Sequence, residues 1–279
     1  MDTKRILTIQ DISCVGKCSL TVALPVISAC GVEAAVLPTA VLATHTAFPS
    51  WTFKDLTDEI QVISDKWKEL SIGFDGIYTG YLGSFLQLEL VGKIFDDFKT
   101  EDNFILVDPV MADNGKLYKG FDQKFAFSMA KLCNKADVIV PNLTEASFML
   151  GVPYVESGYD EKYIRELLKK LCGLGAKVSV LTGVSLEKGK LGVYAFDSVN
   201  NEYFSYYREH LPVSFHGTGD VFASALCGAM AKDFSLKDSL KIAVDYTVEC
   251  IKVTIDNKDH NFYGVDFETA IPYLVGKIK

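Results

Sequence analysis

The sequence predicts an α/β fold in which a mostly parallel central sheet carries helices on both faces. Short, continuously apolar runs alternate with longer helix-compatible stretches along the chain. Continuously apolar strands are typical of parallel sheets, because such strands are buried on both faces. The 279 residues, 49% of them hydrophobic, suffice for a sizeable core. Since no linker, low-complexity tract or internal repeat separates the elements, we expect a single three-layer domain over residues 1–279.

The expected elements follow one another in a regular order. A strand at residues 5–11 leads through Gly16 into a helix at residues 19–30. Further strands are expected at residues 32–42, 76–79, 104–107, 138–141 and 177–181. Further helices are expected at residues 53–70, 85–99, 121–133, from 143 onward, and at 161–174. Residues 192–196 and 203–207 form an expected antiparallel pair, and only helices follow the turn at Gly217.

Charge and composition exclude several classes of function. The formal charge of −8 and the pI near 5.1, with no run of Lys or Arg, disfavour nucleic acid and anionic membranes as partners. No apolar stretch approaches the roughly 20 residues that span a bilayer. Because the seven cysteines are scattered and no signal peptide is recognisable, we expect a cytoplasmic protein with reduced thiols. A small-molecule substrate is therefore the default expectation.

A glycine-rich turn opens the helix that is expected after residue 217. Gly217 and Gly219 flank Thr218, and a small, apolar run follows Asp220. Amides at a helix start, with the positive end of the helix dipole behind them, suit a phosphate or a developing oxyanion. Asp220 can either cap this helix or act as a base beside the anion site. We expect its place at the helix start to lower its pKa and keep it ionised.

Several other polar residues fall just after expected strands or at the start of the next helix. In an open parallel sheet this is the edge at which ligands bind. These residues are Asp11, Thr46, Tyr81, Asp108, Asn142 and Thr182. Three of them have ordinary structural alternatives: Asp108 begins an Asp-Pro turn dipeptide, Asn142 can cap a helix, and Tyr81 can belong to the core.

This set of groups suggests nucleotide-dependent phosphoryl transfer with a divalent cation. Asp108, Asp113 and Glu145 can hold Mg²⁺ directly or through waters, because Mg²⁺ favours oxygen ligands and keeps several waters. Two rival signatures are missing, since the chain has no Gly-x4-Gly-Lys-Ser/Thr loop and no Gly-x-Gly-x-x-Gly after its first strand. A Walker-type enzyme and a dinucleotide-binding dehydrogenase are therefore disfavoured.

Five short motifs resemble those of the ribokinase-like small-molecule kinases, and four of them resemble the pyridoxal kinase branch. They are Gly217-Thr218-Gly219-Asp220, Thr44-His45-Thr46, Thr79-Gly80-Tyr81, Asp108-Pro109-Val110-Met111 and Pro141-Asn142-Leu143-Thr144-Glu145, in matching order and spacing. The resemblance implies a ribokinase-like fold and transfer of the γ-phosphoryl group of ATP to the hydroxymethyl group of pyridoxal, pyridoxine or pyridoxamine. It also implies Mg²⁺, a monovalent cation such as K⁺, and a homodimer.

The resemblance assigns a role to each matching position. Asp220 matches the catalytic base, which also contacts the substrate, and Gly217, Thr218 and Gly219 match the anion hole. Thr46 and Tyr81 match positions at the pyridine ring. The positions matched around the nucleotide and its metal are Asp108, Asp113, Asn142, Glu145 and Thr182, together with Gly219.

Asp11 departs from the family pattern, because the first strand ends in Gln10-Asp11-Ile12 where relatives have Gln-Ser-His. As a substrate-binding residue, Asp11 favours the aminomethyl group of pyridoxamine; alternatively, it accepts hydrogen bonds from backbone amides of residues 15–17. Two other functions stay open. One is a hydroxymethylpyrimidine kinase of the thiamine pathway, which shares the fold and the signature, and the other is a non-catalytic vitamer-binding protein.

Overall fold

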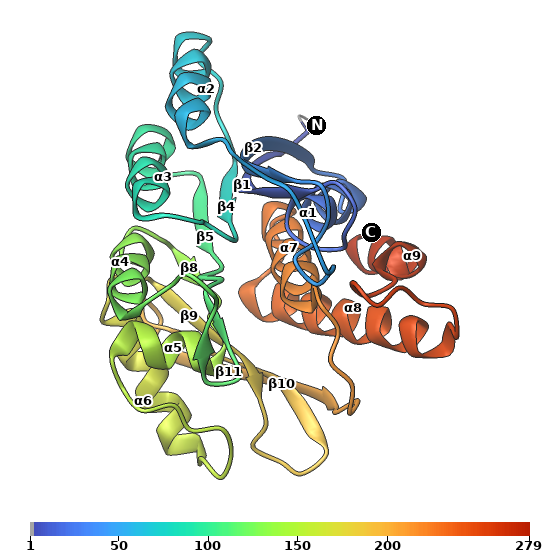
Figure 1. The fold of residues 1–279 in the computed structure, drawn as a ribbon. Coiled ribbons are helices and arrows are strands. Elements are labelled where there is room, and N and C mark those ends of the chain that lie inside the picture. The colour runs from blue at the N-terminus through green and yellow to red at the C-terminus, as the bar shows by residue number, and fades with distance from the viewer. Residues whose placement is uncertain (1–2) are drawn as a thin grey trace. The chain divides into compact units, whose positions relative to one another are not determined.

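The computed structural model describes residues 3–279, and their contacts divide the chain into two compact units. Unit 1 comprises the chain up to Tyr78 together with Leu211–Lys279, and unit 2 comprises Thr79–His210. The predicted α/β fold is confirmed, because both units contain parallel strand pairs and helices flank the strands (Figure 1). That residues 1–279 form one domain stays a prediction.

The strands of unit 1 follow the order β4, β1, β2, β3. Their bounds are Arg5–Ser13 for β1, Glu33–Leu42 for β2, Phe53–Asp55 for β3 and Gly76–Thr79 for β4, which runs one residue past the unit. β1 and β2 are parallel, whereas β3 is antiparallel to β2. The prediction of a helix that begins at residue 53 is therefore wrong for residues 53–55, which form β3. Their backbone groups pair with β2, which satisfies them outside a helix.

The helices of unit 1 place the glycine-rich turn on a tightly packed support. They are α1 (Leu20–Ala29), α2 (Thr57–Glu69), α7 (Thr218–Ala231), α8 (Leu236–Asp256) and α9 (Phe267–Ile278). α1 packs on β1 and β2, and α7 packs on α1 and α8. Nearly all of α7 after its first turn is buried, and its small residues permit this close packing: a Cβ on Gly228 would lie 2.5 Å from Cys30 Sγ. The body of α7, which carries the glycine-rich turn at its start, is therefore tightly packed in unit 1.

The strands of unit 2 follow the order β5, β8, β9, β10, β11. Their bounds are Phe104–Val107 for β5, Val138–Ile139 for β8, Val178–Val184 for β9, Lys190–Asp197 for β10 and Glu202–Glu209 for β11. β5, β8 and β9 are parallel, and β10 and β11 form the predicted antiparallel pair. A small hairpin, β6 (Ala112–Asp113) with β7 (Lys116–Leu117), was not predicted. Its turn consists of Asn114 and Gly115, which have φ of 50° and 75°. Because Asn-Gly is a frequent pair in two-residue hairpin turns, the sequence does contain a signal for this hairpin.

The helices of unit 2 lie one after another beside its strands (Figure 1). They are α3 (Phe85–Phe98), α4 (Gln123–Cys133), α5 (Leu143–Leu150) and α6 (Glu161–Cys172). α6 shows the predicted amphipathic pattern, with Ile164, Leu167, Leu168 and Leu171 buried. Across residues 3–279, none of the helices combines the length and apolar character needed to cross a membrane. The cysteines are free thiols, as expected.

Candidate active site

The turn before α7 has the geometry of an anion site. Gly217 is the N-cap residue of α7, with φ 80° and ψ 0°, a left-handed conformation that glycine adopts without strain. Val221 N donates to Gly217 O at 2.9 Å, so the amides of Thr218, Gly219 and Asp220 precede the first amide that donates within the helix. A Cβ on Gly219 would have nothing within 4 Å, which leaves space beside these amides.

Asp220 and Asp11 both hydrogen-bond to Ser19. The amide of Ser19 donates to the Asp220 carboxylate, and its hydroxyl donates to the Asp11 carboxylate. Asp11 is only 5% exposed, and Asp220 is mostly buried. This supports the second role considered for Asp11, a carboxylate held by the chain itself, although the partner is Ser19 rather than residues 15–17.

Sequence reasoning missed the part that Ser19 takes in this arrangement. Ser19 has φ 49° and ψ −131°, a conformation that is rare for a residue with a Cβ. In the sequence it is only the first residue of an expected helix, and no local pattern marks a positive φ at a serine. In this conformation Ser19 contacts two carboxylates that come from β1 and α7.

The pKa of Asp220 differs from the sequence-based expectation. Burial raises this pKa to about 7, the Ser19 amide opposes the rise, and the charge of Asp11 adds to it. The expected lowering is therefore wrong, because loss of hydration outweighs the stabilisation available at the helix start. Burial raises the pKa of Asp11 as well. Near neutral pH, Asp220 is poised between its two protonation states, which suits a general base.

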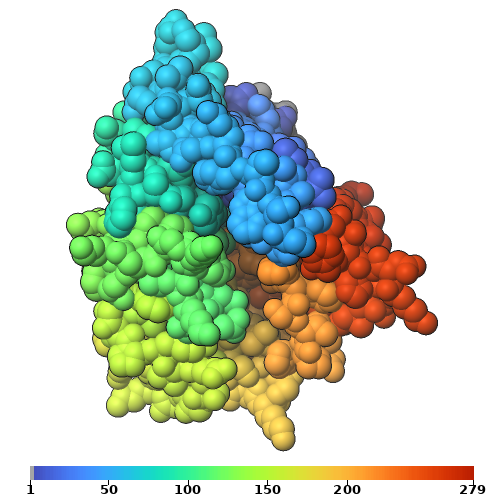
Figure 2. Space-filling model, in the orientation of Figure 1, coloured from blue at the N-terminus to red at the C-terminus, as the bar shows by residue number. Residues whose placement is uncertain are grey.

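Thr46 lies in the loop after β2, close to the turn before α7. Thr46 itself is exposed. The ring of the preceding residue, His45, lies 4.9 Å from the ring of His216, measured between centroids. In the same loop, Phe48 contacts Phe262 at 4.9 Å. Figure 2 shows this loop, in light blue, at the surface beside the red C-terminal segment. The loop and the turn therefore belong to one region of unit 1.

Asn142 and Glu145 form a capping box at the start of α5. Asn142 Oδ1 accepts from Glu145 N, and Glu145 Oε2 accepts from Asn142 N, both at 2.9 Å. Asn142 Nδ2 donates to Ala112 O at 2.9 Å, and Glu145 Oε1 accepts from Met111 N at 3.2 Å. The capping role considered for Asn142 is thus present. These bonds tie α5 to the segment that follows β5.

The three candidate metal ligands lie in one region of unit 2. Asp108 is 7% exposed at the end of β5, and Asp113 is exposed on the β6–β7 hairpin. Burial raises the pKa of Glu145, backbone amides oppose this, and the charge of Asp113 adds to it. In the described part of the chain, no group of three or more His, Cys, Asp or Glu is arranged to hold a metal ion. Oxygen donors of the kind that Mg²⁺ prefers are present, but a closed cage is not, and Mg²⁺ commonly binds through waters and phosphates.

Tyr81 and Thr182 also lie in unit 2. Tyr81 follows β4, is half-buried, and places its ring 5.7 Å from that of Phe121. Thr182 lies on β9, forms a parallel bridge with Asn142, and donates its amide to Pro141 O at 3.0 Å. Asn142 and Thr182 therefore meet at the carboxyl edge of the parallel strands. Their roles at the nucleotide, and that of Tyr81 at a pyridine ring, stay predictions.

Known proteins resemble this chain over most of its length. Residues 22–264 match the family model described as phosphomethylpyrimidine kinase. Pyridoxal kinase from Dictyostelium discoideum is 28% identical over 283 residues, which cover 93% of this chain and 91% of that protein. A putative phosphomethylpyrimidine kinase from Bacteroides thetaiotaomicron, crystallised with pyridoxal, has a TM-score of 0.92 at 38% identity and covers 98% and 96% of the two chains. Pyridoxal kinase from Lactobacillus plantarum has a TM-score of 0.90 at 28% identity, with 99% and 98% covered. The chain belongs to the phosphomethylpyrimidine kinase family of the ribokinase-like superfamily.

Proposed function

We propose that this chain phosphorylates the hydroxymethyl group of a vitamin B6 vitamer, with ATP as the phosphoryl donor. The observation that carries the proposal is the open helix start at Gly217–Gly219, which has Asp220, a carboxylate of raised pKa, in its first turn. Support comes from two relatives named pyridoxal kinase and from the 38% identical structure with pyridoxal.

In the proposed reaction, Asp220 aligns the substrate hydroxyl and accepts its proton late. The hydroxyl oxygen forms a bond to the γ-phosphorus, the bond to the β-phosphate oxygen breaks, and ADP leaves with that electron pair. The transition state is loose and its charge lies on the transferred oxygens, so positioning and electrostatic stabilisation contribute more than proton removal. The amides of Thr218 and Gly219 supply this stabilisation, and Thr218 Oγ1 steadies the turn by donating to Phe215 O at 3.3 Å.

Apart from Gly219, the residues proposed for the nucleotide and its cation belong to unit 2. Mg²⁺ would neutralise charge on the phosphates. We assign Asp108 and Asp113 to hold it, in part through waters. Glu145 acts less directly, because both of its oxygens already accept amide hydrogen bonds. Asn142 and Thr182 are proposed to border the nucleotide, and Thr46 and Tyr81 the vitamer ring.

We further propose that the protein uses a monovalent cation such as K⁺, forms a homodimer and is located in the cytoplasm. The resemblance of the motifs supports these three points. Exchanging K⁺ for a bulky organic cation is expected to lower kcat. Light scattering after gel filtration is expected to give twice the mass of the 30.8 kDa chain.

A turnover assay with purified protein, ATP and Mg²⁺ tests the main proposal. Pyridoxal, pyridoxine and pyridoxamine are offered separately, and both ADP and the vitamer 5′-phosphate are measured. We expect the two products in equal amounts with at least one vitamer, and loss of both in Asp220→Asn. A folded protein that turns over none of the three contradicts the proposal.

The second candidate, a hydroxymethylpyrimidine kinase, is favoured by the description of the family model that covers residues 22–264. Offering hydroxymethylpyrimidine in the same assay decides between the two, because kcat/KM measures the preference directly. Vitamer binding in calorimetry without turnover identifies a non-catalytic binding protein instead.

A further inference from the structure

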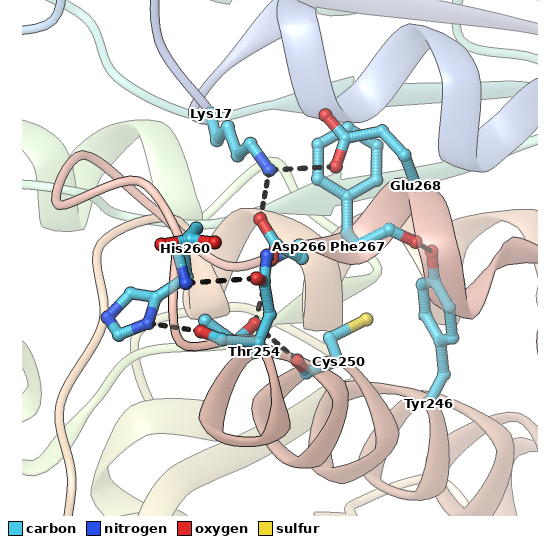
Figure 3. Close-up of polar contacts among 10 residues, drawn as sticks. Lys17, Tyr246, Cys250, Thr254, His260, Asp266, Phe267 and Glu268 are labelled. Carbon is cyan, nitrogen blue, oxygen red and sulfur yellow. Dashed lines mark hydrogen bonds and ion pairs between the residues drawn. The ribbon is translucent and has the colours of Figure 1, made fainter.

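Lys17 is a buried lysine that the proposed reaction does not use. It lies between β1 and α1 with 9% of its surface exposed, and lysine is rarely so buried without a partner. Its Nζ donates to Asp266 Oδ1 at 2.7 Å and to Glu268 Oε2 at 3.0 Å, and Figure 3 shows it turned toward both carboxylates. Burial lowers the pKa of Lys17, but the hydrogen bonds to the two carboxylates and their negative charges together raise it by more, so the ammonium stays charged.

Asp266 is in turn held by the end of α8. Its amide donates to Thr254 Oγ1 at 2.8 Å, and Asn257 Nδ2 donates to its Oδ2 at 2.7 Å. Thr254 Oγ1 donates to Cys250 O at 2.6 Å within the helix (Figure 3). Although burial raises the pKa of Asp266, the hydrogen bonds from Lys17 and Asn257 hold it below its ordinary value. The charged end of Lys17 is therefore tied to α8 and to the start of α9.

The backbone of Lys17 lies against the turn that precedes Asp220. Lys17 O would stand 2.0 Å from a Cβ on Gly217, and Lys17 Cβ would stand 2.5 Å from a Cβ on Gly264. The same hypothetical atom on Gly264 would lie 3.3 Å from His216 O. Lys17 is thus enclosed between the turn and the segment that leads to α9, and the two glycines leave room for it.

The buried ion pairs of Lys17 with Asp266 and Glu268 are not explained by packing alone. Replacing a buried ion pair by apolar residues is often neutral or even stabilising, so such a pair is weak evidence for a role in stability. Hydrogen bonds from an ammonium to two carboxylates are directional, however, and hold the attached backbone in one position. Here that backbone touches Gly217.

We propose that Lys17 is a positioning residue: anchored by Asp266 and Glu268, its backbone sets the place of the Gly217 turn and thereby aims the helix-start amides at the transferring phosphoryl group. The proposal rests on the proposed kinase function. Since misplacing a catalytic group by about 1 Å can lower a rate about 100-fold, loss of the anchor should affect kcat more than KM.

Lys17→Met and Asp266→Asn test this proposal. The first removes the ammonium charge but keeps a long side chain, and the second removes the carboxylate charge but keeps the shape of the Asp266 side chain. We expect each to lower kcat about 10- to 100-fold, with KM for ATP and the vitamer within about threefold. The double variant should be no slower than the worse single variant, since the two residues act as one unit. Lys277→Met is the matched control. It breaks an ion pair with Asp245 between α8 and α9 and should leave kcat unchanged.

Hydrogen exchange of the amides at residues 217–221 tests the position of the turn without turnover. We expect faster exchange there in Lys17→Met and Asp266→Asn than in the wild type and Lys277→Met. If the wild type phosphorylates no vitamer, the proposed function fails, but exchange still decides on Lys17. Should Lys17→Met not fold, Asp266→Asn decides. Folded variants with wild-type exchange and kcat, even if their Tm is lower, overturn the proposal.

Discussion

The carbonyl oxygen of Lys17 lies so close to Gly217 that a Cβ on residue 217 would stand 2.0 Å from it. Two residues further on, a Cβ on Gly219 would meet nothing within 4 Å. The two glycines of one turn therefore serve different purposes. Gly217 makes room for the protein's own backbone, whereas Gly219 borders open space, where we propose that the phosphoryl group binds.

Gly217→Ala is expected to destabilise the protein by about 2 kcal/mol or more, because a residue with a Cβ is strained at φ 80° and the new atom overlaps Lys17 O. Thermal melts without any ligand measure this. A wild-type Tm would show that the loop at Lys17 moves aside freely.

Gly219→Ala is expected to fold with a Tm near that of the wild type, because the added methyl group meets open space in the protein. Its kcat should nevertheless fall at least about tenfold, since the methyl group hinders the approach of the phosphoryl group to the amides. Steady-state kinetics beside a melt of the same sample test both parts. Unchanged kinetics would mean that the turn is only structural.

Asp220→Asn should keep the fold and ATP binding while kcat drops about two to four decades, the usual range for loss of a general base. Since the folded pKa of Asp220 is about 7, kcat/KM of the wild type should rise with pH through that value. A pH profile of the wild type, with turnover of the variant at high pH, checks this. Near-normal turnover of the variant removes Asp220 from the role of base.

The same raised pKa has a consequence for stability. Because the folded pKa of Asp220 lies above its ordinary value of 3.8, the folded protein binds the extra proton between about pH 4 and 7. The wild type therefore loses stability relative to Asp220→Asn as the pH rises through this window. Melts should show a higher Tm for the variant at pH 8 and no advantage at pH 4. An equal difference at both pH values contradicts the shift.

Asp11→Ser should reduce kcat/KM for pyridoxal, pyridoxine and pyridoxamine alike. The reason is that the Asp11 carboxylate is buried and accepts a hydrogen bond from Ser19, whose amide also holds Asp220. Parallel measurements on the three vitamers test this. A loss confined to pyridoxamine, about tenfold to a hundredfold for a charge-assisted hydrogen bond, would instead place Asp11 at the substrate amine.

Asp137→Asn should destabilise the protein by about 2–3 kcal/mol. Asp137 accepts from Lys99 Nζ, Lys177 Nζ and Ile105 N, each at 2.8 Å, and these bonds hold its pKa below the ordinary value although burial raises it. Its contribution is therefore present above about pH 4 and is lost as the pH falls through the lower folded pKa. Chemical denaturation at pH 7 and pH 2 measures this.

Asp65→Asn is the matched control for Asp137. It removes an exposed ion pair with Lys68 and should change stability by less than about 1 kcal/mol. Equal effects of the two substitutions at pH 7 would contradict the structural role of Asp137.

Much of the fold follows from patterns that are local along the chain. Alternating apolar runs and helical stretches predicted the parallel strands and the flanking helices, because burial on one or both faces imposes a period on the sequence. α6 is an example, with its buried residues three and four apart. The candidate site residues were found in the same way, since the ends of parallel strands and the starts of helices are recognisable from short motifs.

Tertiary structure decided what depends on partners distant in the sequence. Residues 53–55 became a strand because β2 lies beside them. Asp220 acquired its raised pKa from burial and from Asp11, which lies more than two hundred residues away in the chain. Lys17 hydrogen-bonds to Asp266, 249 residues away in the sequence, because both belong to unit 1 of the folded chain. The sequence alone determined which groups the chain carries and the order of most of its elements, whereas desolvation and long-range hydrogen bonds, which exist only in the folded chain, determined the charge and orientation of those groups.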